Sequence, residues 1–208
     1  MKEKDTERIL KMREFEESIY NRGITVFAGV DEAGRGPLAG DVYAAAVILK
    51  RGELIEGLND SKKLSPKKRD ALFDVIKERA LSWSVGTASV SEIEETDILS
   101  ANFLAMRRAV EGLGTEPELI IVDGNLKIRS LEDKCEALVK GDSVSESVAA
   151  ASVLAKVSRD RYMVKMAEKY PEYEFYKHKG YGTARHIELI KKYGPSPIHR
   201  LSFLKNIL

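Results

Sequence analysis

The chain has 208 residues, of which 43% are hydrophobic and 32% charged, and its formal net charge is +1. One domain with at most a small appendage is the expected size, and such a chain can bury a core without disulfides. Its single cysteine, Cys135, excludes a disulfide framework and a zinc site built from thiolates. The first residues are charged and no uncharged apolar run is long, so we expect no signal peptide, no membrane span and a cytoplasmic location.

The charge is distributed unevenly along the chain. Residues 151–208 hold twelve Lys or Arg and five Asp or Glu, a local net charge of +7, so the remainder carries −6. This asymmetry fits an acidic reaction centre beside a basic binding surface. Solvated helix faces would explain the charge alone equally well.

Taken in chain order, apolar periodicity and end signals predict helices that alternate with strands. The predicted elements are a helix at 4–20, strands at 25–30 and 42–49, a helix at 65–80, a strand at 81–90, helices from 91 onward and at 98–113, strands at 118–122 and 138–141, and helices at 143–169 and 183–192. Strands cluster early and helices late, which predicts a mixed α/β or α+β layer fold. We divide the chain into a helical lead-in, residues 1–22, and one domain, residues 23–208.

Several residues give finer expectations about these elements. Ser65 followed by Pro66 indicates a helix start, and the segment Ser91–Glu94 has the capping-box pattern. We expect the following side chains in the core: Met106, Met163, Met166 and Trp83. We expect Glu146 and Asp160 at the surface of the long helix. The tail, residues 203–208, is apolar enough for a partner contact, but a packed C-terminal helix is the better explanation.

Acidic residues stand where apolar elements end. Asp31 and Glu32 follow the run ITVFAGV, Asp123 follows ELIIV, and Asp142 lies between LVKG and the long helix. An isolated acid there is usually a turn former or a helix N-cap, and for Asp142 alone we favour that interpretation. Adjacent strand residues point to opposite faces, so either Asp31 or Glu32 should point into the structure, where a carboxylate needs a partner.

Carboxylates from several strand ends would repel one another, and a divalent cation relieves that repulsion. Ligands that are all oxygen select hard ions, chiefly Mg²⁺ or Mn²⁺, and two such ions close together form a standard device for phosphodiester hydrolysis. The three histidines, His178, His186 and His199, do not form an HExxH pattern, so we do not expect zinc.

A glycine-rich segment, residues 34–39, matches the GxGxxA dinucleotide fingerprint and suggests an oxidoreductase as a rival. That fingerprint needs a helix after the turn, whereas AGDVYAAAVIL reads as a strand, and acids beside a pyrophosphate would repel it. Two interpretations of the segment remain. It is a plain hairpin loop, or it is a loop in which Gly34 and Gly36 let the backbone approach a substrate while Arg35 adds charge.

Basic residues gather at two further places. Lys62 and Lys63 follow Asp60-Ser61 and are our candidates for phosphate contacts, whereas residues 67–69 are expected on a solvated helix face. Another group, Lys177, Lys179 and Arg185, brackets Tyr181 and suits a nucleic-acid groove; Tyr181 could instead cap the core. A passive nucleic-acid-binding module would explain the basic tail but not the acids at the strand ends.

Six strings, in register from about residue 25 to the end, make the chain resemble ribonuclease HII, a type 2 ribonuclease H. They are GVDEAGRGPLAG at 29–40, NDSKKLSPKKR at 59–69, IIVDGN at 120–125, KGDSVSESVAAASVLAKVSRDR at 140–161, HKGYGTARH at 178–186 and PIHRLSF at 197–203. Asp41 departs from the pattern, because that family commonly has proline there. This change affects the exit of the glycine-rich loop.

The resemblance implies a ribonuclease H-like α/β fold, with a central mixed sheet flanked by helices and a helical C-terminal portion. It implies these metal-binding and catalytic acids, around two Mg²⁺ or Mn²⁺ ions: Asp31, Glu32, Asp123 and Asp142. The loop Gly34, Arg35 and Gly36 would contact the ribonucleotide and its 2′-hydroxyl, and Tyr181 would pack on the sugar of the next deoxynucleotide.

The implied activity is endonucleolytic hydrolysis on the 5′ side of ribonucleotides in duplex DNA or RNA–DNA hybrids, leaving a 3′-hydroxyl and a 5′-phosphate. The expected partner is therefore nucleic acid, bound by a monomer. The 2′-hydroxyl, both donor and acceptor, distinguishes RNA from DNA at a single position. A sliding-clamp contact through the C-terminal tail has no support in the sequence beyond the apolar character of that tail.

Overall fold

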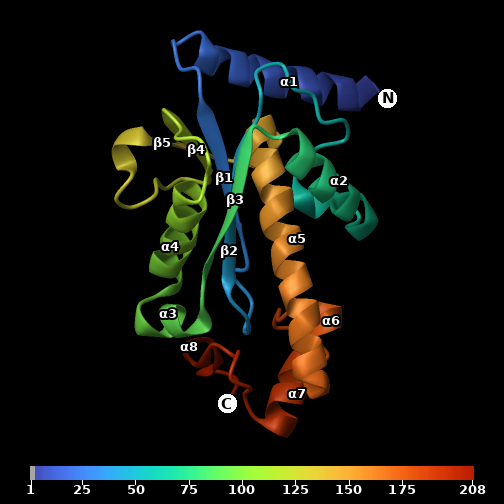
Figure 1. Cartoon of the computed structure of the whole chain (residues 1–208). Coiled ribbons are helices and arrows are strands. Elements are labelled where there is room, and N and C mark those ends of the chain that lie inside the picture. The colour runs from blue at the N-terminus through green and yellow to red at the C-terminus, as the bar shows by residue number, and fades with distance from the viewer. Residues whose placement is uncertain (1–2) are drawn as a thin grey trace.

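The structure is a computed structural model that describes the backbone of residues 3–208 and side chains from Glu7 onward (Figure 1). Its helices are α1 Glu3–Tyr20, α2 Pro66–Arg79, α3 Val90–Glu95, α4 Ile98–Glu111, α5 Glu146–Lys169, α6 Phe175–His178, α7 Ala184–Tyr193 and α8 Leu201–Leu204. Its strands are β1 Phe27–Ala33, β2 Val42–Ile48, β3 Ser82–Ala88, β4 Leu119–Asp123 and β5 Cys135–Leu138.

The five strands form one mixed sheet in the order β3-β2-β1-β4-β5. β1 pairs antiparallel with β2 and parallel with β4, while β2–β3 is antiparallel and β4–β5 parallel. Helices cover both faces, which confirms the predicted mixed α/β fold with a central sheet flanked by helices. β1 lies in the middle of the sheet and beside the parallel strand β4, so their C-terminal ends share one edge.

The strand alternation divides the interior into two apolar layers. Ala45 and Val47 of β2 face the layer packed against α5 and α2, whereas Ala44 and Ala46 face the layer packed against α4. Figure 1 shows α5 along one side of the sheet and α4 on the other. α1 crosses one end of the molecule and contributes Met12 to the first layer.

Glycines allow the two main helices to touch the sheet directly. A Cβ atom at Gly29 of β1 would lie 2.2 Å from the backbone carbon of Ser147 at the start of α5. A Cβ atom at Gly86 of β3 would lie 2.2 Å from the backbone oxygen of Ala105 in α4. Only glycine fits such an approach, so these positions set how closely the layers pack.

The C-terminal helices form a small satellite core at the far end of α5. Met163 is fully buried there against Tyr173, Phe175 and Leu189. Of the tail expected as a packed helix, residues 203–208, only Phe203 and Leu204 lie in a helix, the short α8, in which Leu204 is buried. Within residues 3–208, no helix is long and apolar enough to cross a membrane.

Several sequence expectations about local structure were wrong or displaced. β1 extends through Ala33, so Asp31 and Glu32 lie within the strand instead of after it. β5 covers Cys135–Leu138, not 138–141, because Lys140 adopts a left-handed backbone and leads into a turn. The capping box pairs Ser89 with Glu92, two residues before the predicted one. The N-cap at Ser65 is confirmed.

The remaining core expectations hold in different degrees. Met106 of α4 and Met163 of α5 are both buried. Met166 and Trp83 are partly buried and pack against the core. The division into a lead-in and one larger domain stays a prediction.

Replacing Gly29 by alanine should destabilise the protein because the new methyl group would overlap the backbone of α5. We expect a loss of about 3 kcal/mol, near the upper end of measured overpacking costs. For a chain of this size that corresponds to a melting temperature lower by about 6–12 °C. Gly114→Ala is the matched control, because its methyl group would lie 3.8 Å from the nearest side chain, Ser82. Equal melting temperatures for the two variants would contradict the close contact.

Candidate active site

Three aspartates meet at the sheet edge where β1 and β4 end. Asp31 belongs to β1, Asp123 is the last residue of β4, and Asp142 lies in the one-turn 3-10 helix Gly141–Ser143 just before α5. One carboxylate oxygen from each lies within 4.8 Å of the others. The parallel pairing of β1 with β4 explains the meeting, because parallel strands carry their C-terminal residues to one edge.

Backbone hydrogen bonds hold these carboxylates in place. The amide of Gly141 donates to Oδ1 of Asp123 at 2.7 Å, which ties the turn before α5 to the end of β4. The amide of Glu32 donates to Oδ1 of Asp31, also at 2.7 Å. Asp142 is not the N-cap of α5, as one interpretation had it, because Ser145 fills that position and accepts from the amide of Val148.

Glu32 lies outside this triad. Its neighbour Asp31 is buried, with 6% of its surface exposed, and points toward α5, as the strand alternation predicts for one of the two acids. Glu32 borders the α4 side, near Asn102, and its Oε1 lies 3.4 Å from Nη1 of Arg35. The two acids therefore approach the sheet end from opposite faces.

Burial and the repulsion between like charges disfavour the ionised form of the carboxylates in this site. Burial, with the charges of Glu32 and Asp123, raises the pKa of Asp31 well above its usual range. Burial also raises the pKa of Asp142, helped by the charges of Asp123 and Asp60. The pKa of Glu32 is raised by burial, although Arg35 opposes the shift. Such groups favour a cation or protons among them.

The donor set fits a hard divalent cation. Carboxylate oxygens are the ligands that Mg²⁺ and Mn²⁺ prefer, and the triad offers three on different elements. Lys62 is a cation already near the site. Burial alone would lower its pKa, but the surrounding acids, Asp31 foremost, raise it.

A cavity of about 190 Å³ opens beside the acids. Its lining includes residues 33–36, Ser61, Lys62, Ser152, Lys156 and Tyr181, in addition to Asp31 and Glu32. Lys63 is directed elsewhere: its Nζ donates to Oγ of Ser143 at 3.3 Å and lies 3.6 Å from Oδ2 of Asp60. The structure thus separates the two lysines, with only Lys62 of this pair at the cavity.

The two glycines of the loop differ in what surrounds them. Gly34 has a positive φ of 102°, and a Cβ atom there would lie 2.1 Å from Nε of Arg159. Gly36 has no heavy atom within 4 Å of such a Cβ atom. The fold therefore requires Gly34, whereas Gly36 borders open space where a ligand can approach the backbone. β2 follows the loop instead of a helix, so the dinucleotide interpretation fails.

Tyr181 lies between the cavity and a larger groove of about 710 Å³. Its side chain is 43% exposed, so it does not cap the core. The groove runs beside α5 between the start of α2 and α6, and Lys177 and Lys179 line it. Arg185 pairs instead with Glu174 and Glu188 on the adjoining surface.

The comparisons with known proteins agree with this geometry. A family model described as Ribonuclease HII matches residues 28–206. The chain belongs to the ribonuclease HII family. It is 55% identical over 195 residues to Ribonuclease HII of Caldicellulosiruptor bescii, which covers 94% of both chains. As a ribonuclease H, the protein is an endonuclease that hydrolyses RNA in RNA–DNA hybrids.

Two solved structures resemble the fold of this ribonuclease HII family member. The ribonuclease H2 of Pyrococcus horikoshii has a TM-score of 0.75 and 29% identity, covering 88% of this chain and 96% of that one. The ribonuclease HII of Archaeoglobus fulgidus, solved in complex with PCNA, has a TM-score of 0.65 and 27% identity, covering 85% and 94%.

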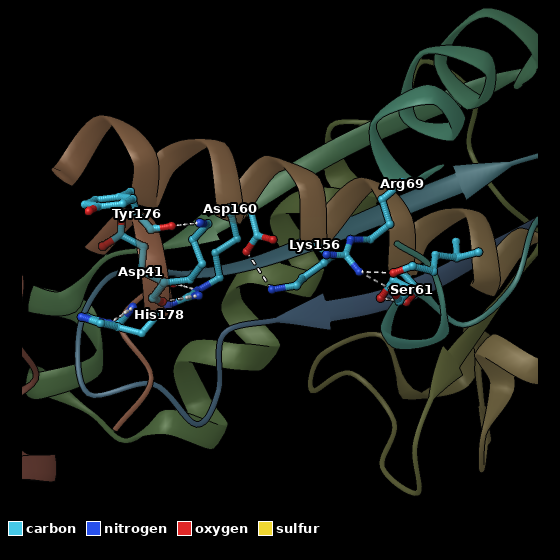
Figure 2. A network of polar contacts seen from close by, with 12 residues as sticks. Asp41, Ser61, Arg69, Lys156, Asp160, Tyr176 and His178 are labelled. Carbon is cyan, nitrogen blue, oxygen red and sulfur yellow. Dashed lines mark hydrogen bonds and ion pairs between the residues drawn. The ribbon is translucent and has the colours of Figure 1, made fainter. Parts of the chain in front are cut away.

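The structure adds residues to the ribonuclease site that sequence reasoning missed. Lys156 of α5 lines both the cavity and the groove, and its Nζ pairs with Oδ1 of Asp160 at 2.7 Å (Figure 2). Buried Ser152 donates from Oγ to Oγ of Ser61 at 2.8 Å, beside Asp31. Ser152, Lys156 and Asp160 are spaced by four residues, so one helix face was the available signal.

Two acids near the site differ from the expectations for this ribonuclease. Glu146 was expected at the surface but is only 2% exposed, and its Oε1 is buried without a partner. Burial, together with the charge of Glu16, raises the pKa of Glu146 to about 7.

Asp41, where the family commonly has proline, accepts a hydrogen bond from the amide of Val90 at 3.1 Å and so binds the start of α3.

The surface expectation for Glu146 failed because α1 covers the start of α5. Oε1 of Glu16 accepts from Oγ of Ser145 at 2.7 Å and from the amide of Ser147 at 2.8 Å. This contact joins segments about 130 positions apart and no local pattern announces it. Asp160 lies closer to the surface, as expected, than Glu146 does. Its side chain is 20% exposed and pairs with Lys156.

Glu146→Gln should stabilise the protein at pH 8 and change little at pH 5. Folding raises the pKa of Glu146 to about 7, so the folded state holds the proton more tightly than the unfolded chain. Its favourable contribution is present at low pH and is lost as the pH rises from about 4.3 through that value. We expect the free energy of unfolding to be about 1–3 kcal/mol higher than that of the wild type at pH 8. Urea unfolding of both proteins at pH 5 and pH 8 measures the difference.

Glu17→Gln is the control for that measurement. Glu17 is exposed and hydrogen-bonded to Arg51, which lowers its pKa, so its neutralisation should not stabilise the protein at pH 8. A Glu146→Gln variant with no greater advantage at pH 8 than at pH 5 would refute the buried-acid explanation.

Proposed function

We propose that this chain cuts the phosphodiester on the 5′ side of ribonucleotides embedded in duplex DNA or in RNA–DNA hybrids, leaving a 3′-hydroxyl and a 5′-phosphate. The observation that carries the proposal is the position of Asp31, which belongs to the acidic triad and also lines the cavity that the glycine-rich loop and Tyr181 border. A nuclease centre thereby lies within reach of groups able to recognise a sugar.

Asp31, Asp123 and Asp142 are the residues that would hold Mg²⁺ or Mn²⁺, with Glu32 at the border of the site. A pair of such ions supplies an activated water and charge stabilisation of the leaving oxygen. The closeness of the three acids, two of them buried, supports this assignment, because their mutual repulsion is relieved by cations. Lys62, kept cationic by the acids, would contact the phosphate.

The glycine-rich loop would read the 2′-hydroxyl through its backbone. Gly36 leaves open space where a ribose can approach closely, and the 2′-hydroxyl offers both a donor and an acceptor. Arg35, half-exposed beside Glu32, would add positive charge for a phosphate. Backbone contacts of this kind would recognise the sugar and not the base, which suits an enzyme that acts on ribonucleotides of any base.

Tyr181 would pack on the deoxyribose next to the ribonucleotide. Its ring lies 5.8 Å from Nζ of Lys156 and 5.8 Å from Cζ of Arg159, so cations hold it at the mouth of the cavity. The adjoining groove with Lys177 and Lys179 would follow the nucleic-acid backbone. Together these features favour a nuclease over a passive binding module, which has no need of the acids.

A monomer would suffice for this reaction, because every proposed group comes from one chain. The A. fulgidus relative was solved in complex with PCNA, and a sliding-clamp contact is the corresponding proposal for this chain. In the tail, Leu204 is buried and Phe203 packs against the core, while Leu208 is 67% exposed. The exposed end is where such a contact would form.

A duplex with one ribonucleotide decides the substrate assignment. The protein should nick that duplex once, on the 5′ side of the ribonucleotide, and leave an all-DNA duplex whole. Replacing the 2′-hydroxyl by hydrogen or methoxy should stop cleavage, because a site built to bond a hydroxyl leaves its own groups unpaired without it. Gel analysis of end-labelled strands with Mg²⁺ or Mn²⁺ measures this, and efficient cutting of all-DNA duplexes would sink the ribonucleotide assignment.

Asp31→Asn and Asp123→Asn should each slow nicking roughly a thousand-fold, equivalent to about 4 kcal/mol of transition-state stabilisation. Each change removes a charge without changing shape, so the fold should persist. Asp31→Asn should also melt at a higher temperature without added cation, because a buried repelling charge is lost. Asp74→Asn, at an exposed position of α2, is the control and should match the wild type. Near-normal nicking by either site variant would overturn the assignment.

A further inference from the structure

Two fully buried arginines, Arg159 and Arg200, lie behind the glycine-rich loop, and neither is assigned a contact with the substrate. Arg200 directly precedes α8. Its guanidinium donates to the carbonyl oxygens of Gly34 at 2.6 Å, Arg35 at 2.9 Å, Pro37 at 2.9 Å and Gly40 at 2.9 Å. One side chain thus gathers carbonyls from both ends of the loop.

Arg159 of α5 touches the same loop and also the Tyr181 segment. Nε donates to the backbone oxygen of Asp41 at 3.1 Å, and Nη2 donates to that of Ala39 at 3.0 Å. Nη1 donates to the backbone oxygen of Lys179 at 3.0 Å, two residues before Tyr181. The side chain also fills the space that a Cβ atom of Gly34 would need.

These arginines are charged groups without carboxylate hydrogen-bond partners in the described part of the chain: their partners are backbone carbonyls. Such burial is costly unless the donors are satisfied, and here the carbonyls satisfy them. Burial and the nearby charge of Arg159 lower the pKa of Arg200 to about 9, so it stays cationic at neutral pH. The carboxylate of Asp41 adds a compensating charge.

The loop carbonyls turn inward toward these cations, which leaves its opposite side for the cavity. Gly36, on that open side, has free space where a side chain would be. The loop amide of Leu38 also donates to the carbonyl of Gly180 at 2.8 Å, so the loop and the Tyr181 segment are joined by backbone as well. The relative placement of the two segments therefore depends on this buried region.

We propose that Arg200 and Arg159 are positioning residues that set the conformation of the glycine-rich loop, and that Arg159 couples this loop to Tyr181. Their role in recognition rests on the proposed function, since it is the loop and Tyr181 that would contact the sugar. Arg200 acts on the loop alone, whereas Arg159 acts on both segments. The two arginines therefore differ in a way that an experiment can resolve.

Trypsin susceptibility measures the loop conformation without any substrate. The bonds Arg35–Gly36 and Lys179–Gly180 report on the two segments, and the exposed bond Arg51–Gly52 is the internal reference. In Arg200→Met, cleavage at Arg35–Gly36 relative to the reference should rise at least ten-fold. In Arg159→Met, the relative rates at both Arg35–Gly36 and Lys179–Gly180 should rise. Mass spectrometry of the fragments gives each rate.

Kinetics on the single-ribonucleotide duplex supply the second readout. Both methionine variants should lose at least ten-fold in kcat while KM changes less than three-fold, because surface cations still bind the duplex. Arg200→Lys, which keeps the charge but has fewer donors, should recover part of kcat. If Arg200→Met does not fold, the Arg200→Lys variant can be tested in its place.

Ile76→Ala controls for stability alone, because Ile76 of α2 is fully buried in the first apolar layer and does not contact the loop. At temperatures well below its melting temperature, the Ile76→Ala variant should keep the wild-type kcat. Its cleavage rates at the three tryptic bonds should all change by the same factor. The proposal is overturned if the arginine variants behave like Ile76→Ala, or if their kcat stays within two-fold of the wild type. A wild type that fails to cut the duplex would instead overturn the proposed function, and the tryptic ratios would still test the loop.

Discussion

The direct packing of α5 on β1 at Gly29 places most of the groups in the site. The contact leaves no room for a side chain, so the start of the helix lies against the centre of the sheet. Asp142 precedes the helix, Ser152 and Lys156 face the cavity about two and three turns into it, and Arg159 reaches the glycine-rich loop. A looser contact would move all of these relative to Asp31, because they belong to one rigid helix.

The same packing concentrates negative charge that the protein alone does not neutralise. Asp31 and Asp142 are buried with raised pKa values at one end of the sheet, and Glu146 is buried beside Glu16 nearby. Each of these acids opposes folding when ionised. Structural acids of this kind are expected to be paired, so their persistence at the sheet edge is better explained by cation binding than by stability.

The sequence predicted much of this arrangement, for identifiable reasons. Asp31 and Asp123 each follow an apolar run, and parallel strands share an edge, so their meeting follows from local pattern once the two strands pair. Periodicity predicted the order of helices and strands, whereas the central mixed sheet was implied by the family resemblance. What could not be read were contacts between distant segments: Glu16 bonded to the start of α5, and the loop carbonyls bonded to Arg200. No local signal marks Glu146 as buried or distinguishes Lys62 from Lys63.

Arg200 also has a consequence for how the protein is made. Its hydrogen bond to Gly40 joins positions 160 apart, and in chain order it follows every strand and all three acids of the triad. During translation the sheet and the acidic triad can be complete while the glycine-rich loop still lacks Arg200. The loop then takes its final shape only after Arg200 has left the ribosome, so a nascent chain that ends before Arg200 would hold the acids without an ordered loop beside them.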